Sequence, residues 1–205
     1  MKSLLILSLI IFGTISPQTQ IGKMSISGFT GFLIPLGDFG KSFNPGLQYG
    51  LTGRTKMPGI PAYLADYDIE SEFVIGFVRY SGETSETLPK SEYTTIVLIG
   101  NAILNLNPTA KEMGSGGINP FVIVGVGYYL SRSIGQLKWT DWDGTTWTLD
   151  YDEPDPGVGI NFGAGASYFI NQNIFIDGIV KYHYILPEVD SISLFDIRIA
   201  IGGYF

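Results

Sequence analysis

The sequence predicts an all-β protein: an eight-stranded antiparallel up-and-down transmembrane β-barrel preceded by an N-terminal signal peptide. First, long segments alternate large apolar residues with small or polar ones at every second position, which is the period of a β-strand. Second, the polar faces carry mainly glycine, serine and scattered charges, which indicates a sheet with its apolar side outward. Third, beyond the N-terminus no apolar run is long enough for a membrane helix, so a membrane crossing would use closed strands.

The clearest hairpin runs from Val158 to Ile185. Its first arm places six apolar residues on one face: Val158, Ile160, Phe162, Ala164, Ala166 and Tyr168. After the turn-prone triplet 171–173, the second arm alternates Ile174, Ile176, Val180, Tyr182 and Tyr184 with Asp177, Lys181 and His183. The last strand, Leu194 to Phe205, repeats the pattern and ends on an aromatic residue. Each segment has about the 9 to 11 residues that a tilted transmembrane strand needs.

Composition limits the classes of protein and of partner. The 205 residues indicate one domain, and 15% charged residues is well below the roughly 25% typical of soluble domains. The net charge of −7 argues against nucleic acid, whose phosphates require a basic surface. Without cysteine there is neither a disulfide nor a thiolate metal site.

The N-terminus has the features of a secretory signal. Lys2 precedes the apolar run 4–12 and the small residues 14–16, and cleavage is expected between Ser16 and Gln20. We therefore expect a signal peptide over 1–18 and an outer-membrane barrel domain over 19–205. About nine apolar residues are too few for a membrane-spanning helix.

Five further strands precede the hairpin. They are expected over residues 22–34, 47–54, 63–80, 93–107 and 120–132, separated by loops rich in Pro, Gly and Ser. The third is predicted to place four carboxylates on one face, those of Asp66, Asp68, Glu70 and Glu72. In the fourth strand the alternation is incomplete, because Val97, Ile99 and Ile103 place apolar residues on the otherwise polar face.

An even number of strands returns both termini to one side, which is predicted to be the periplasm. The loops beginning at Pro35, Ser81, Ser133 and Leu186 would then face outward from the cell, and the turns at 57, 108 and 171 would be periplasmic. The turn after Pro108 has about 12 residues, which is long for a periplasmic turn.

Three segments of the mature chain resemble a known family. They are Gly31–Phe39, Asn119–Phe121 with Gly125–Gly127, and Ile201–Phe205. They resemble the small outer-membrane barrels of the OmpX and OmpA type, the outer membrane protein β-barrel domains. We expect a monomer in outer-membrane lipid. The resemblance implies insertion by the barrel assembly machinery, with Tyr204 and Phe205 as the assembly signal.

Inward-facing charges of both signs are expected to form one network inside the barrel. Its members are Lys23, Arg54, Asp66, Asp68, Glu70, Glu72, Asp177, Lys181, His183, Asp196 and Arg198. Eight strands enclose a space that side chains just fill, so these charges should pair and close the lumen. The alternative is a narrow porin-like pathway for ions or small solutes.

An enzyme is not expected. Small outer-membrane barrel lipases and deacylases use a His and a Ser two positions apart on one strand face. His183 is the one histidine, and position 185 is Ile185. We expect no catalytic residue, no cofactor and no metal site.

The connection Gln136 to Asp155 is the most distinctive exposed segment, and its candidate binding residues are Trp139, Asp141, Trp142, Asp143 and Trp147. Asp143-Gly144 is a strong two-residue hairpin signal, so the flanking strands should continue as a ribbon above the membrane. The tryptophans could stack on sugars or lie in the interfacial aromatic belt. The carboxylates could hold calcium, although their spacing does not match an EF-hand.

Two functions remain open from the sequence. One is a structural or adhesive surface barrel whose extracellular loops meet a protein or a glycan. The other is a narrow channel. A soluble ligand-binding barrel of the lipocalin kind would need its apolar residues inside, which the pattern disfavours.

Overall fold

The computed structural model describes residues 24–57, 59–61, 64, 67–82, 90–113, 115–187 and 191–205. The predicted signal peptide, Lys23 and Asp66 lie outside these residues. The strands are β1 Ser25–Leu36, β2 Gly46–Lys56, β3 Asp68–Ser81, β4 Lys90–Asn105, β5 Ile118–Thr140, β6 Thr146–Pro154, β7 Gly157–Phe169, β8 Ile174–Leu186 and β9 Ile192–Tyr204. Two short helices accompany them, α2 Gly37–Ser42 and the 3₁₀ turn η2 Pro108–Lys111. No α-helix within this described part is both long and apolar enough to cross a membrane.

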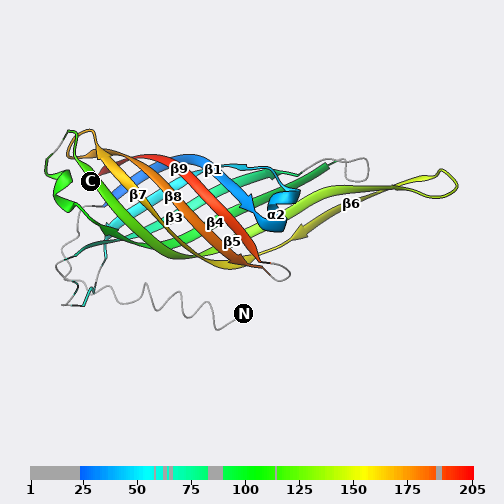
Figure 1. Cartoon of the computed structure of the whole chain (residues 1–205), viewed down its shortest axis with the longest axis horizontal. Coiled ribbons are helices and arrows are strands. Elements are labelled where there is room, and N and C mark those ends of the chain that lie inside the picture. Colours follow the sequence, from blue (N-terminus) through cyan, green and yellow to red (C-terminus); the bar gives the residue numbers. More distant parts are fainter. Residues whose placement is uncertain are drawn as a thin grey trace.

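Eight of these strands close into a barrel. They follow one another in the order β4-β3-β2-β1-β9-β8-β7-β5, every pair is antiparallel, and β4 pairs with β5 to complete the ring (Figure 1). The strand β6 pairs with β5 and stands outside the ring. Because closure leaves no free sheet edge within the ring, the backbone groups of the wall are satisfied between neighbours. The predicted fold class is confirmed.

The register sends large apolar side chains to the outer surface. Leu51, Val124 and Ile201 are each between 57% and 60% exposed, whereas the neighbouring residues Thr52 and Ala200 are buried inside. This is the inverse of a soluble barrel, and it requires an apolar surrounding for the outer face. The predicted facing is confirmed for the last strand by Ile201 and for the hairpin by Ile160 and Phe162, which are exposed, and Lys181, which is buried.

Apolar and charged side chains share the interior, and Arg198 lies over the ring of Phe29. The apolar cluster includes Phe29, Leu33, Val78, Val97 and Ile99, all buried. The residues of β4 that blurred the alternation therefore face inward. Their volume fills the interior at positions whose facing the sequence alternation left open.

One predicted boundary is wrong. Strand β3 begins at Asp68 rather than Tyr63, because the preceding amides bond locally, Leu64 N to Pro61 O and Tyr67 N to Leu64 O. Strand β5 continues past residue 132 to Thr140 and β6 returns beside it, as predicted for the strands that flank the Asp143-Gly144 turn. Both arms together form the ribbon, defined here as residues 132–154. It projects beyond the rest of the barrel (Figure 1).

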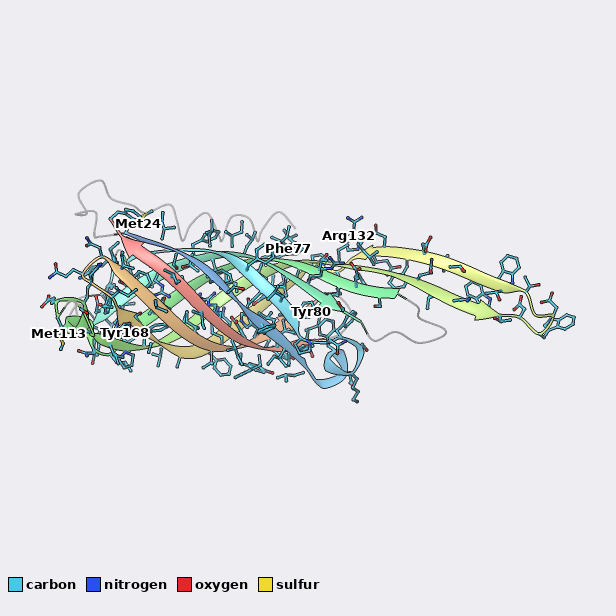
Figure 2. All side chains as sticks on the ribbon, turned by 90° about the horizontal axis from the view of Figure 1, so that it is seen from above. Met24, Phe77, Tyr80, Met113, Arg132 and Tyr168 are labelled. Atoms are coloured by element: carbon cyan, nitrogen blue, oxygen red, sulfur yellow. The ribbon has the colours of Figure 1, made fainter. Side chains whose placement is uncertain are left out.

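An aromatic cluster lies at the end of the barrel from which the ribbon departs, the ribbon-side mouth. There α2 places the ring of Phe39 against Phe43, Tyr80 and Tyr93, with centroid distances of 4.7, 5.7 and 5.1 Å. Tyr80 is buried, and Figure 2 places it with Arg132 toward this end. These packed rings narrow the opening at this end.

The opposite end is the termini-side mouth, where Phe205 N donates to Met24 O at 2.8 Å. Here η2 inserts Ala110, which is fully buried, against Phe169 and Phe175. Gly116 N donates to Phe169 O and Phe169 N donates to Gly117 O, both at 2.9 Å. The unusual length of the turn after Pro108 thus has a structural reason, since the turn folds back over the mouth.

Candidate functional site

The interior charges gather around Glu72 on β3. Arg54 on β2 donates its Nε to Glu72 Oε2 at 2.8 Å, and an Arg198 terminal nitrogen lies 3.1 Å from Glu72 Oε1. Asn101 on β4 also donates to Glu72 Oε1, at 2.7 Å. A second terminal nitrogen of Arg54 lies 2.7 Å from Asp177 Oδ2 on β8. One carboxylate thus joins β2, β3, β4 and β9, and Arg54 extends the cluster to β8.

A second cluster surrounds Asp196 on β9. Lys181 Nζ lies 3.6 Å from Asp196 Oδ2, and His183 Nε2 lies 3.3 Å from the same oxygen. Gln48 donates its side-chain amide to Asp196 Oδ1. On the other side of the imidazole, the Tyr129 hydroxyl is 2.7 Å from His183 Nδ1. His183 is therefore a buried interior residue held by a tyrosine and a carboxylate.

The predicted charge network is present only in part. Glu72, Arg54, Asp177, Lys181, His183, Asp196 and Arg198 are buried together. Asp68 and Glu70 instead line the termini-side mouth. The predicted set omitted Gln48, Asn101 and Tyr129, which are the neutral members of the two clusters. Their inward position in the alternation could have revealed them, but a search for charge alone passes over neutral hydrogen-bonding residues.

Several buried polar atoms of the interior lack an aligned hydrogen bond within the described residues. They include both Asp177 carboxylate oxygens, Lys181 Nζ and the side-chain amide of Asn161. The Arg54–Asp177 contact is therefore a close charge pair whose angles do not suit a hydrogen bond. Such groups require charge neutralisation or bound water, because an isolated buried charge is strongly unfavourable.

The ribbon presents two different faces. Leu137 pairs with Leu149, and Trp139 pairs with Trp147, in adjacent cross-strand positions of the same parity. All four side chains are between 38% and 52% exposed. Leu137 and Trp139 are an even number of positions from Tyr129 on β5, and the Tyr129 side chain points into the barrel. The four ribbon side chains therefore continue the inward face of the barrel wall beyond the mouth. The tryptophans of the two strands are therefore not on the lipid-facing parity that an aromatic belt would need.

The opposite face of the ribbon is polar. Its cross-strand pairs include Lys138 with Thr148, Gln136 with Asp150, and Thr140 with Thr146, and near the barrel Ile134 pairs with Asp152. On this parity Arg132 also donates two hydrogen bonds of 2.5 Å to the Asp152 carboxylate. The ribbon is thus amphipathic, with one apolar face and one polar face.

Acidic residues at the tip stabilise the hairpin. Trp147 Nε1 donates to Asp141 Oδ2 at 2.8 Å, and Thr145 N donates to Asp143 Oδ1 at 2.9 Å. The latter bond lowers the pKa of Asp143 from its ordinary value. Between Asp141 and Thr145 the chain turns through three residues, with Gly144 at φ 84°, rather than through the predicted two. Gly144 supplies the positive φ that this turn requires. Within the described residues, no group of three His, Asp or Glu side chains is arranged to hold a metal ion.

Comparisons with known proteins place this fold. No protein-family model matches the sequence, and no curated protein matches it either. Among solved structures, the chain is similar to Ail, the attachment invasion locus protein of Yersinia pestis, with 14% identity and a TM-score of 0.52 over 91% of this chain and 100% of that chain. Neisserial surface protein A is 14% identical, with a TM-score of 0.53 over 89% of this chain and 97% of that chain. A major outer membrane protein from Thermus thermophilus is 11% identical, with a TM-score of 0.52 over 89% of this chain and 98% of that chain.

These likenesses establish the fold, which is that of the small bacterial outer-membrane β-barrels. The resemblance drawn from the sequence is confirmed at this level. At 11% to 14% identity, the likeness does not extend to what the solved proteins bind.

Proposed function

We propose that the protein is an outer-membrane barrel with a closed lumen that binds an extracellular partner through the apolar face of its ribbon. The observation that carries this proposal is the pair of adjacent cross-strand contacts, Leu137–Leu149 and Trp139–Trp147, on a ribbon that projects past the barrel. Clustered exposed apolar side chains in water mark interaction surfaces. Tryptophan is among the residues that contribute most to binding energy at such surfaces.

The membrane location is supported by the outward apolar band and by the solved barrels of the same fold. The start of β1 and the end of β9 lie at the mouth opposite the ribbon (Figure 1). In the orientation we propose, that mouth faces the periplasm and the ribbon faces outward from the cell. The C-terminal Tyr204 and Phe205 then stand where the assembly machinery would meet the last strand.

A closed lumen is supported by the side chains that fill it. The void between Phe29, Leu33 and the Asp196 cluster measures about 10 Å³, barely enough for one water molecule. Apolar side chains fill the space beside the charges, since Leu33 pairs with Asp196 and Phe29 with Ala200. The aromatic rings around Phe39 narrow the ribbon-side mouth. A narrow ion channel is the second candidate, favoured by the interior polar atoms that lack hydrogen bonds. Planar-bilayer recording separates the two, and a steady large conductance from the purified protein would establish the channel.

The partner we infer is an extracellular protein with a basic, partly apolar binding segment. Residues 132–155 carry six carboxylates against two basic side chains, so the ribbon repels acidic surfaces and other copies of itself. Along β6, the backbone edge facing away from β5 has no strand partner in the described part of the chain. An extended segment could add to this edge and reach the apolar face with its side chains.

The test compares the two faces of the ribbon. Trp139→Ser with Trp147→Ser removes the aromatic pair, and Lys138→Ser with Thr148→Ser is the matched pair on the polar face. We expect the first double variant to lose adhesion of expressing cells to host matrix proteins, while the second retains it. Both should assemble normally, because neither pair contacts the barrel interior. Equal adhesion of both variants and the parent would refute binding through this face, and adhesion blocked by a soluble sugar would indicate a glycan.

A further inference from the structure

A cavity of about 540 Å³ lies at the termini-side mouth, beneath the turn that carries η2. It is lined from the ends of six strands, β2, β3, β4, β5, β7 and β9, and from η2 itself. The residues used below are Lys56, Asp68, Glu70, Lys111, Glu112 and Tyr204. Its volume is within the range of small-molecule sites, about 300 to 1,000 Å³. This mouth is remote from the ribbon, so the proposed adhesive function does not account for it.

The cavity carries more carboxylates than ammonium groups. Asp68, Glu70 and Glu112 face Lys56 and Lys111. Asp68 is already engaged, since Asn105 Nδ2 donates to Asp68 Oδ2 at 2.9 Å and Lys56 Nζ lies 3.7 Å from Asp68 Oδ1. Glu70 is more than nine-tenths buried within this wall, where the Asn105 side chain and the charges of Arg54 and Lys111 also act on it. A buried carboxylate in a hollow with excess negative charge favours a cationic occupant.

An ammonium group of the protein already occupies part of the cavity. Lys111 Nζ lies 3.1 Å from the centroid of the Tyr204 ring, which packs in turn against Phe175 at 5.1 Å between centroids. An aromatic face with carboxylates nearby is a recognised arrangement for binding organic cations. The Lys111 ammonium, on the η2 turn, thus occupies the position over the Tyr204 ring where the ammonium of a ligand would bind.

We propose that this cavity binds a small organic polyamine, with one ammonium on the Tyr204 ring in place of Lys111 and another toward Glu70 and Glu112. A flexible diamine or triamine can place two charges in a hollow of this size, whereas an inorganic cation makes no use of the aromatic wall. An anionic ligand would meet three carboxylates and two lysines that already have partners.

The experiment is calorimetric titration of the purified protein in detergent with spermidine, with glutarate as a dianion of comparable length. We expect spermidine to bind at one site and glutarate not to bind. Replacing Lys111→Met removes the competing ammonium and should tighten spermidine binding by about three- to tenfold, the range of one cation–π contact. Lys138→Met removes the same charge from the ribbon and should leave the affinity unchanged.

Two carboxylate variants complete the test. Glu70→Gln and Glu112→Gln should each weaken spermidine binding by about tenfold, corresponding to one lost charge contact. Asp143→Asn at the ribbon tip should not weaken it. Because Glu70 is buried, heat-modifiable migration in detergent gels must first show a folded barrel, and exposed Glu112 provides the same test without that risk. Equal effects of Glu112→Gln and Asp143→Asn, or no tightening by Lys111→Met, would overturn the site.

Discussion

Replacing Arg54 by methionine tests whether the interior charges are removed from water. The guanidinium binds Glu72 and Asp177, whose side chains are fully buried. It also lies over the rings of Phe121 and Phe175, at 5.3 and 5.9 Å from their centroids. Methionine keeps much of the apolar stem but leaves Asp177 without its ion pair. Removing one partner of a buried pair costs roughly 3 to 5 kcal/mol.

The matched control is Arg132→Met on the ribbon. Arg132 binds Asp152 through two short hydrogen bonds, but both side chains are about half exposed. Exposed ion pairs contribute about 0 to 1 kcal/mol, and a bidentate Arg–carboxylate pair such as this one is expected at the upper end of that range. Urea unfolding of the two variants in detergent, followed by gel migration, gives the two free energies. A loss for Arg54→Met as small as that for Arg132→Met would mean that water reaches the interior charges, and the closed lumen would be refuted.

Three other outcomes are expected. Val124→Arg, on the outer face of β5, should cost about 2 to 4 kcal/mol, while Val158→Arg near the start of β7 should cost about 1 or less, because the penalty falls toward the membrane surface; equal unfolding midpoints would contradict the assigned depths. Lys181→Met should destabilise the barrel less than Arg54→Met, since Asp196 retains its bonds to His183 and Gln48, and urea midpoints rank the two. The Asp143 pKa is lowered by its bond from the Thr145 amide, so its contribution to turn stability is present above the ordinary Asp pKa and lost as the pH falls through the lowered one; a Thr145 amide shift that titrates at or above the ordinary value would exclude the bond.

The sequence alone determined the class of fold and the facing of most strand residues. The alternation of Ile160, Phe162 and Ala164 with Asn161 and small residues has a period of two, and only one parity can face lipid when the other carries the polar groups. The ribbon was also predictable, because a turn signal lay between two β-rich arms. These are local properties, which neighbouring positions along the chain record directly.

The tertiary structure decided which interior groups meet. Glu72 and Arg198 are 126 positions apart, and their contact exists only because β4 pairs with β5 and closes the ring. Closure likewise explains Gly125, where an added Cβ would collide with the Asn101 side chain and the Gly100 carbonyl. The alternation gave the parity of these residues, but their heights along the barrel depend on register.

The capped ends also became visible only in three dimensions. The long turn after Pro108 looked inconsistent with a periplasmic position, until the insertion of Ala110 between Phe169 and Phe175 gave it a role. The apolar filling of the interior could not be predicted from the sequence either, because β4 carries apolar residues on both faces and Val97 and Ile99 turned out to be buried. Sequence alternation reports which side of a wall a residue occupies, whereas the filling of a closed volume depends on every strand that surrounds it.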